Sequence, residues 1–328
     1  MTPAVTTGAP GRGWLLPYLG AALIWGCSFL FIKLGLEALS PIHVAFGRQA
    51  LWALTLLLLA AATRVRLPRG RATWGHLFVV ALLMNSVPST LFAFGETHVS
   101  SVVAGIINAV TPLATILAAF AAFPSERPTA GKVAGILVGF AGILVVVGIW
   151  NGVGSSEGLG VLACLGAVAC YGIGFPYIRR NLAPRGERPL ALATGQIALA
   201  AIQLLPFALL DASPVGELTP RVLGGMLALG ALGTGIAYVW NFQVIDRAGA
   251  TTASTVTYLT PLVAIAVGAL LLGEPVTLNQ PLGGLVVLLG VALAQGRLAL
   301  PERRRGPDQR VDGPESRSVR SRNRSSNR

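Results

Sequence analysis

The chain has 328 residues, of which 53% are hydrophobic and 12% are charged, and its mean hydropathy is +0.68. A soluble domain carries roughly 25% charged residues, so this chain has too few charges to cover a water-facing surface, and most of it must be surrounded by lipid. The net charge of +12 does not indicate nucleic-acid binding. Ten of the 25 Lys and Arg lie from Arg297 onward, and most of the others lie in short gaps between apolar stretches.

A short polar stub, residues 1–14, precedes ten apolar stretches. Each stretch is long enough to cross a bilayer, which takes about 20 helical residues. The sequence therefore predicts an all-α integral membrane protein with transmembrane helices at 15–36, 41–62, 74–94, 101–123, 131–149, 158–178, 189–210, 222–243, 249–272 and 281–299. The tail, residues 300–328, is basic and has no apolar face to bury, which predicts a disordered cytoplasmic segment.

Lys and Arg concentrate on one side of the predicted membrane. If the N-terminus is cytoplasmic, the inner segments hold 22 of the 25 Lys and Arg, and the outer loops hold Arg221 alone. This bias predicts that both termini are cytoplasmic, which requires an even number of spans, and it places Glu96 and Glu274 on the outer side. We expect a multi-pass protein of the plasma (inner) membrane.

An internal repeat relates residues 15–149 to residues 158–299. Near the end of each half, a Thr-Pro pair is followed by a Glu that leaves the helix and by a Gly-rich closing helix. The Thr-Pro pairs stand at 111–112 and 260–261, and the glutamates are Glu126 and Glu274. Each half holds five predicted helices, an odd number, so the two copies must enter the membrane from opposite faces. Two inverted repeats are a transporter architecture, because the same packing in opposite orientation supplies one state open to each side.

Three segments resemble a known family. They are LIWGCSFLFIKLGLEALSPIHVAFGRQAL in the first two predicted helices, TPLATILAAFAAFPSERPTAGKVAGILVGFAGILVVV in the fourth and fifth, and TPLVAIAVGALLLGEPVTLNQPLGGLVVLLGVAL in the last two. Their order and doubling resemble the EamA-type family of the drug/metabolite transporter superfamily over residues 15–297. The chain departs from a symmetric pattern at one place, because the second-half counterpart of Arg48 is Gly195.

The resemblance implies ten helices around a central cavity formed chiefly by the first, third, fourth, sixth, eighth and ninth. The fifth and tenth helices resemble peripheral or dimer-contact elements. Family members move amino acids, related metabolites or amphiphilic compounds outward across the plasma membrane. We therefore expect a small-molecule exporter that works by alternating access through a central cavity.

A cavity for a zwitterion or an amphiphile needs a few hydrogen-bonding groups among apolar and aromatic walls. Asn85 and Asn108 are expected to face inward, since an amide in lipid without a partner is costly. The alternative is that such groups join helices by hydrogen bonds. The candidate substrate contacts are Trp25, Ser28, Arg48, Asn85, Ser89, Asn108 and Thr111 in the first half and Tyr171, Phe175, Thr234, Tyr238, Trp240, Thr257 and Tyr258 in the second.

Arg48 lies within the second predicted helix, about 10 Å below the outer surface at helical rise. It is either a contact for an anionic group, a latch between helices, or a structural cation that snorkels or bonds carbonyls. Lys33 lies nearer the outer end, which favours snorkelling. No Asp or Glu is predicted in the middle of a span, and this favours facilitated export or exchange over proton coupling.

Proline and glycine positions predict mechanical features. Four prolines interrupt helical hydrogen bonding and are expected to act as hinges, namely Pro88, Pro112, Pro176 and Pro261. Gly131, Gly135 and Gly139 follow one another at four-residue spacing, which favours close helix packing.

The sequence predicts no metal site, no cofactor and no catalytic residue. It contains neither a CxxC motif nor a Cys/His cluster, and its acidic residues are scattered singly. Two alternatives to a transporter remain open at this point, namely a polytopic enzyme acting on lipid-like substrates and a non-transporting scaffold. The enzyme would show clustered Asp, Glu or His at a membrane boundary, and the scaffold would not require two inverted copies. The expected partners are a small-molecule substrate and membrane lipid, with a homodimer as a further option.

Overall fold

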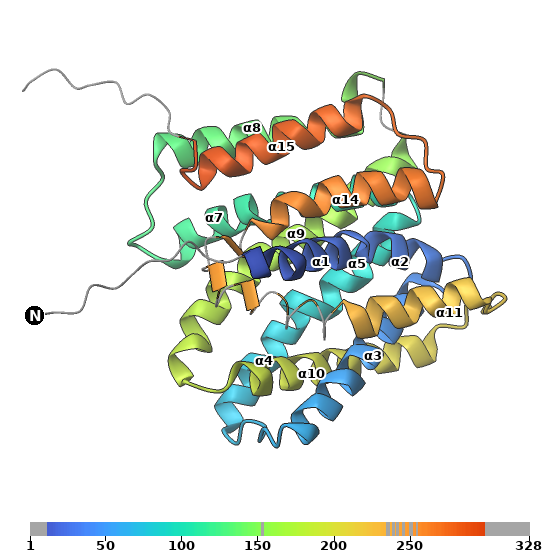
Figure 1. Cartoon of the computed structure of the whole chain (residues 1–328), viewed down its shortest axis with the longest axis vertical. Coiled ribbons are helices and arrows are strands. Elements are labelled where there is room, and N and C mark those ends of the chain that lie inside the picture. The colour runs from blue at the N-terminus through green and yellow to red at the C-terminus, as the bar shows by residue number, and fades with distance from the viewer. Residues whose placement is uncertain are drawn as a thin grey trace, which may run out of the picture.

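The computed structural model describes residues 12–151, 154–233 and 256–298, together with positions 237, 240, 243, 244, 247, 248, 252, 253 and 255. The described part is helical and contains no strand (Figure 1). Seven helical stretches within it are long and apolar enough to cross a membrane, and two shorter apolar helices follow them. The protein is therefore a multi-pass membrane protein. The predicted tail and most of the N-terminal stub lie outside the described residues.

The first half contains five of the seven long stretches. In chain order its helices are α1 (Leu15–Gly26), α2 (Ser28–Gly35), α3 (Pro41–Ala62), α4 (Arg71–Ala81), α5 (Val87–Glu96), α6 (Ser101–Asn108), α7 (Thr111–Ala122) and α8 (Ala130–Val147). Between α4 and α5 the chain makes a π-helical turn, η2 (Leu82–Ser86). Side chains of Ser40, Ser100 and Thr129 cap the N-termini of α3, α6 and α8 by accepting backbone hydrogen bonds.

The second half repeats this plan. Its helices are α9 (Ser155–Asn181), α10 (Pro189–Leu210), α11 (Pro220–Leu227), α14 (Val256–Leu271) and α15 (Asn279–Ala294). A second π-helical turn, η5 (Ala228–Leu232), continues α11, just as η2 continues α4 in the first half. The third membrane helix of each half therefore carries the same irregularity.

The two Thr-Pro pairs solve the same backbone problem in the same way. Proline lacks an N–H, so Pro112 and Pro261 leave the carbonyl four residues earlier without its helical donor. In the first half, the hydroxyl of Thr111 donates to the Asn108 carbonyl at 2.7 Å. In the second, the hydroxyl of Thr260 donates to the Thr257 carbonyl at 2.9 Å. Each threonine thus satisfies the acceptor that the following proline leaves free.

Helices α8 and α15 lie side by side along one edge of the molecule (Figure 1). Glycine permits this close approach, because a Cβ on Gly135 would lie 2.4 Å from the backbone nitrogen of Ala294 and 2.5 Å from the Gly290 carbonyl. Further along α8, Gly142 faces Gly283. Residue numbers rise along α8 as they fall along α15, so these corresponding helices of the two halves run antiparallel.

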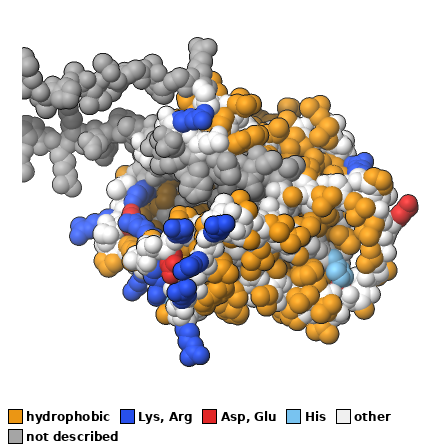
Figure 2. Space-filling model, turned by 60° about the horizontal axis from the view of Figure 1, so that its bottom comes forward, with side chains coloured by type: hydrophobic (Ala, Val, Ile, Leu, Met, Phe, Trp, Pro, Cys, Tyr) orange, Lys and Arg blue, Asp and Glu red, His pale blue; other side chains and the backbone are white. Residues whose placement is uncertain are grey.

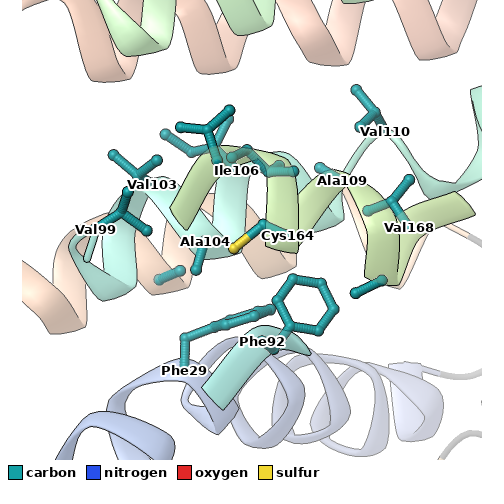
Figure 3. Close-up of a cluster of buried hydrophobic side chains, with 14 of the residues drawn as sticks. Phe29, Phe92, Val99, Val103, Ala104, Ile106, Ala109, Val110, Cys164 and Val168 are labelled. Carbon is teal, nitrogen blue, oxygen red and sulfur yellow. The ribbon is translucent and has the colours of Figure 1, made fainter. Parts of the chain in front are cut away.

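A dense apolar core occupies the part of the bundle around α5, α6 and the first half of α9 (Figure 3). Phe29 and Phe92 meet edge to face there, with ring centroids 5.4 Å apart. Cys164 is fully buried in the same cluster, and a Cβ on Gly95 would lie 2.6 Å from its sulfur. This region therefore holds the helices at van der Waals distance.

Charged and apolar side chains are separated on the surface. Figure 2 shows Lys and Arg gathered at one end of the molecule, while hydrophobic side chains cover the flank. Large apolar side chains such as Leu16, Leu137 and Leu210 are 74%, 66% and 82% exposed. Such an apolar flank is suited to lipid rather than water.

Candidate functional site

A cavity of about 820 Å³ lies between the two halves. Seven of the residues proposed from sequence as substrate contacts line it, namely Trp25, Asn85, Asn108, Thr111, Tyr171, Phe175 and Thr257. Four of them come from the first half and three from the second. The cavity is therefore shared by the two repeats rather than enclosed by one.

Irregular backbone places two of the polar side chains on the wall. Asn85 belongs to the π-helical turn η2, and its Oδ1 accepts a 2.6 Å hydrogen bond from Nε2 of Gln196 on α10. Asn108 ends α6, where the chain turns into α7. Trp25 Nε1 donates to the Gly233 carbonyl at 3.3 Å, which fixes the indole ring across the halves. Polar groups are thus held at defined positions in a mainly apolar wall.

Four predicted contacts do not line this cavity. Ser28 and Ser89 donate to backbone carbonyls of their own helices, at 3.4 Å to Ile24 and 2.5 Å to Asn85. Trp240 packs against the small apolar cluster of Ala21, Ala22 and Val256. Tyr258 does not line the cavity, but its hydroxyl donates at 2.5 Å to Oε1 of Gln295, which does. Thr234 and Tyr238 lie outside the described residues.

Arg48 lies behind the cavity wall. Its guanidinium carbon is 5.6 Å from the ring centroid of Trp52, and Trp52 lines the cavity. Arg48 Nε is buried and has no hydrogen-bond partner among the described residues. The alternatives of an anion contact, a latch and a structural cation remain predictions, but direct exposure to the cavity is not what this structure shows.

Helices α3 and α10 contribute wall residues that the sequence reasoning missed. These are Trp52, Leu56 and Leu59 from α3 and Pro189, Leu190, Ala193, Gln196 and Ile197 from α10. Most are apolar, so they look like lipid-facing or core residues in the sequence. The sequence did offer a signal for Trp52 and Gln196, because each side chain carries a hydrogen-bonding group within a largely apolar stretch.

The four prolines predicted as hinges occupy different settings. Pro112 stands at the start of α7 and lines the cavity. Pro88 stands at the start of α5, directly after η2. Pro176 and Pro261 lie inside α9 and α14 without ending those helices. Their role as hinges stays a prediction.

The cavity extends toward the end of the bundle at which Lys and Arg gather (Figure 2). We call this the arginine-bearing end. Its wall includes Leu59 near the end of α3, Pro189 at the start of α10 and Gln295 at the end of α15. Arg64 and Arg188 stand beyond those helix ends. A ligand would therefore reach the cavity from the arginine-bearing end.

At the opposite end of the bundle, hydrogen bonds of Glu274 hold the two halves together. We call this the fastened end. Its carboxylate accepts hydrogen bonds from the backbone nitrogens of Ser101 (2.9 Å) and Val102 (3.3 Å) and from the Ser101 hydroxyl (2.9 Å). A negative charge at a helix N-terminus is also favoured by the helix dipole. This contact joins the loop after α14, in the second half, to the first turn of α6, in the first.

Glu126, the first-half counterpart of Glu274, makes a different contact. It pairs with Lys132 at 3.1 Å and with Arg179 at 3.2 Å. The hydrogen bond from Lys132, followed by that from Arg179, lowers the pKa of the Glu126 carboxyl from its usual value. Both partners lie at the arginine-bearing end, so this glutamate is held there by two ion pairs, of which the one with Lys132 is partly buried and the one with Arg179 is more exposed.

Lys33 and Glu96 meet near the fastened end. Lys33 Nζ donates to the backbone carbonyls of Glu96 (2.5 Å) and Val99 (3.0 Å), so it caps the C-terminus of α5 in addition to any contact with solvent. The Glu96 side chain, which the charge pattern places on the outer side just after a predicted span, is fully buried. Among the described residues, no three His, Cys, Asp or Glu side chains converge as metal ligands.

Comparisons with known proteins agree on one family. The model of the EamA-like transporter family matches residues 12–148 and again residues 158–295. A protein named "Uncharacterized transporter" from Archaeoglobus fulgidus is 28% identical over 288 residues, covering 85% of this chain and 97% of the relative. "Uncharacterized transporter YoaV" of Bacillus subtilis is 25% identical over 281 residues, covering 84% and 94%.

A third relative carries a more specific name. It is the "Probable terminal-alkyne amino-acid exporter" of Streptantibioticus cattleyicolor, 28% identical over 279 residues, which cover 83% of this chain and 90% of the relative. Among solved structures, one crystal structure covers 88% of this chain and 100% of its own chain with a TM-score of 0.60. At 20% identity, that likeness shows the fold alone.

Proposed function

Since this chain belongs to the EamA-like transporter family, we propose that it exports neutral amino acids or related amphiphilic metabolites across the plasma membrane. The observation that carries the proposal is the 820 Å³ cavity that both halves line with aromatic and uncharged polar side chains. Substrate enters from the cytoplasm and leaves outside after the two halves rearrange.

The proposed architecture has ten spans in two inverted repeats, residues 15–149 and 158–299, with both termini in the cytoplasm. The double match of the family model supports the repeat, and the antiparallel pairing of α8 with α15 supports the inversion. The gathering of Lys and Arg at one end supports the orientation (Figure 2). Inverted repeats give two equivalent packings, one open to each side.

The cavity wall suits a zwitterion with an apolar side chain. An ammonium group can lie against the faces of Trp25, Trp52 or Tyr171, since aromatic rings attract cations. A carboxylate can accept hydrogen bonds from side-chain amides such as those of Asn108 and Gln196. The remaining wall is apolar and fits a hydrocarbon or aromatic side chain. The name of the Streptantibioticus relative, an amino-acid exporter, points to the same class.

The experiment uses purified protein in proteoliposomes and radiolabelled phenylalanine as the probe. Counterflow measures exchange of labelled for unlabelled phenylalanine, without a driving gradient. Replacing Asn85 with Ala removes the acceptor for Gln196 and is expected to lower counterflow roughly tenfold, because a lost buried hydrogen bond costs about 1–3 kcal/mol. The variants Asn108→Ala and Trp25→Ala are expected to act in the same direction.

The matched control is Trp150→Ala, at a tryptophan that is 63% exposed and does not line the cavity. Its counterflow should equal that of the wild type. Size-exclusion profiles check that each variant is folded. Unchanged counterflow in all three cavity variants would show that substrate does not use this cavity.

A further inference from the structure

Glu96 is the only buried Asp or Glu in the described part of the chain. It is the last residue of α5, its side chain is 0% exposed, and neither carboxylate oxygen has a hydrogen-bond partner among the described residues. An ionised carboxyl group inside a membrane bundle is costly unless it is paired. A neutral carboxylic acid is less costly to bury, so such a group is suited to binding and releasing a proton.

Charged and titratable groups approach Glu96 from several elements packed on α5. Lys33 of α2 holds the backbone carbonyl of Glu96 with its ammonium group. Arg48 of α3 and Glu274, in the loop after α14, act electrostatically on the same carboxyl group. From α9, the Cys164 thiol lies against the neighbouring Gly95. Tyr171, also of α9, interacts electrostatically with Arg48. The element α6, by contrast, contributes no titratable side chain.

Further buried polar groups lie on α3, which packs on α5. Arg48 Nε, Gln49 Oε1 and Trp52 Nε1 are buried without hydrogen-bond partners among the described residues. Native proteins leave few such groups without a function or a bound water. Trp52 lines the cavity and Arg48 lies against its ring. These groups are therefore on a helix that borders the substrate space and also packs on α5, which ends at Glu96.

We propose that Glu96 is a proton-binding site of the transport cycle, so that substrate export is coupled to proton entry. This rests on the proposed transport function and names its driving ion. It differs from the sequence-based expectation of facilitated export or exchange, which rested on the absence of Asp and Glu from the middle of the predicted spans. Arg48 and Lys33 are the cations that balance the ionised form.

The proton balance of one cycle follows from the position of Glu96. When the contact between Glu274 and α6 opens, the Glu96 carboxylate takes a proton from external water and becomes a carboxylic acid. When that contact closes again, the acid releases the proton to water that enters from the cavity side, and the positive charge of Arg48 favours the carboxylate that forms. One proton enters as substrate leaves, and nothing is oxidised or reduced.

The test compares wild type with Glu96→Gln in proteoliposomes, again with labelled phenylalanine. Three quantities are measured: counterflow at equal pH, accumulation driven by an imposed pH gradient, and proton movement reported by a trapped pH dye. Wild type is expected to show all three. Glu96→Gln is expected to keep counterflow and to lose both gradient-driven accumulation and phenylalanine-dependent proton movement, because the amide cannot titrate.

Glu217→Gln, at an exposed glutamate, is the control and should behave as wild type in all three assays. Glu96→Asp keeps a titratable group and should restore part of the coupling, which a purely structural role would not do. Gradient-driven accumulation that survives in Glu96→Gln overturns the proposal. So does wild-type counterflow without any proton movement, a result that needs no variant to fold. Absence of wild-type counterflow instead contradicts the proposed transport function.

Discussion

The two ends of the bundle use corresponding glutamates in different ways. At one end Glu274 accepts three hydrogen bonds from the first turn of α6 and fastens one half to the other. At the arginine-bearing end Glu126 is bound by Lys132 and Arg179 instead. The dense core lies near the fastened end, and the cavity extends toward the other. Equivalent parts of a repeat are thus in two states within one molecule.

This difference suggests how the two halves can alternate between a state open to the cytoplasm and a state open to the outside. If the halves exchange roles, Glu126 takes the position that Glu274 has here and binds the start of the ninth span, while Glu274 is released. The site at the arginine-bearing end then closes as the other end opens. Each glutamate would act as a latch for one of the two states.

Removing the Glu274 latch is expected to have the largest effect. Glu274→Gln weakens a carboxylate cap, and loss of such a cap costs about 1–2 kcal/mol, or roughly a 5–30-fold change in the population of the closed end. The readout is labelling of Cys164, fully buried in the structure, by a membrane-impermeant thiol reagent applied outside. The rate should rise by that factor in a background where Cys27 and Cys170 are replaced with alanine. An unchanged rate would mean that Glu274 does not hold this end shut.

Removing Glu126 is expected to have a smaller effect of opposite sign. In the present state it makes two partly exposed ion pairs, whose contribution is small, whereas in the opposite state it would serve as the latch. Glu126→Gln should therefore favour the present state and lower external labelling of Cys164 about two- to fivefold. Faster labelling, as in the Glu274 variant, would contradict the proposed exchange of roles.

Replacing Asp211 is expected to have the smallest effect, and this effect concerns the stability of the fastened end alone. Hydrogen bonds from Ser213 and Ser40 lower the pKa of its carboxyl to about 2 from the ordinary 3.8. A depressed folded-state pKa gives stability that is complete above pH 3.8 and is lost as the pH falls toward 2. Thermal unfolding in detergent should show this loss in the wild type, and Asp211→Asn should remove that part of the pH dependence. Identical pH profiles for the two proteins would exclude a role for Asp211.

Sequence reasoning located residues of the cavity wall where a residue type stands out from its surroundings. Asn85 and Asn108 are isolated amides in apolar stretches, and both line the cavity. The paired Thr-Pro motifs located equivalent backbone irregularities in the two halves. Seven long membrane helices follow directly from apolar length, although the described residues do not fix the total number of spans.

The remaining features depend on packing that a single sequence does not display. Ser28 and Ser89 look like ligand contacts, but their hydroxyls satisfy helical carbonyls instead. Leu56 and Ile197 look like ordinary core residues, yet the pairing of α3 with α10 brings them to the wall. Glu96 lies just after the predicted span 74–94, and its burial becomes visible only when the neighbouring helices are in place.

Accessibility of the cavity from each membrane face tests the central claim most directly. Thr115→Cys places a thiol on the cavity wall, and labelling is compared between inside-out and right-side-out vesicles of a variant without native cysteines. The account predicts labelling from the cytoplasmic face, slowed by excess phenylalanine, and added labelling from outside when Glu274→Gln is present. Labelling that is equally fast from both faces in the parent protein, or confined to the outside, would contradict it.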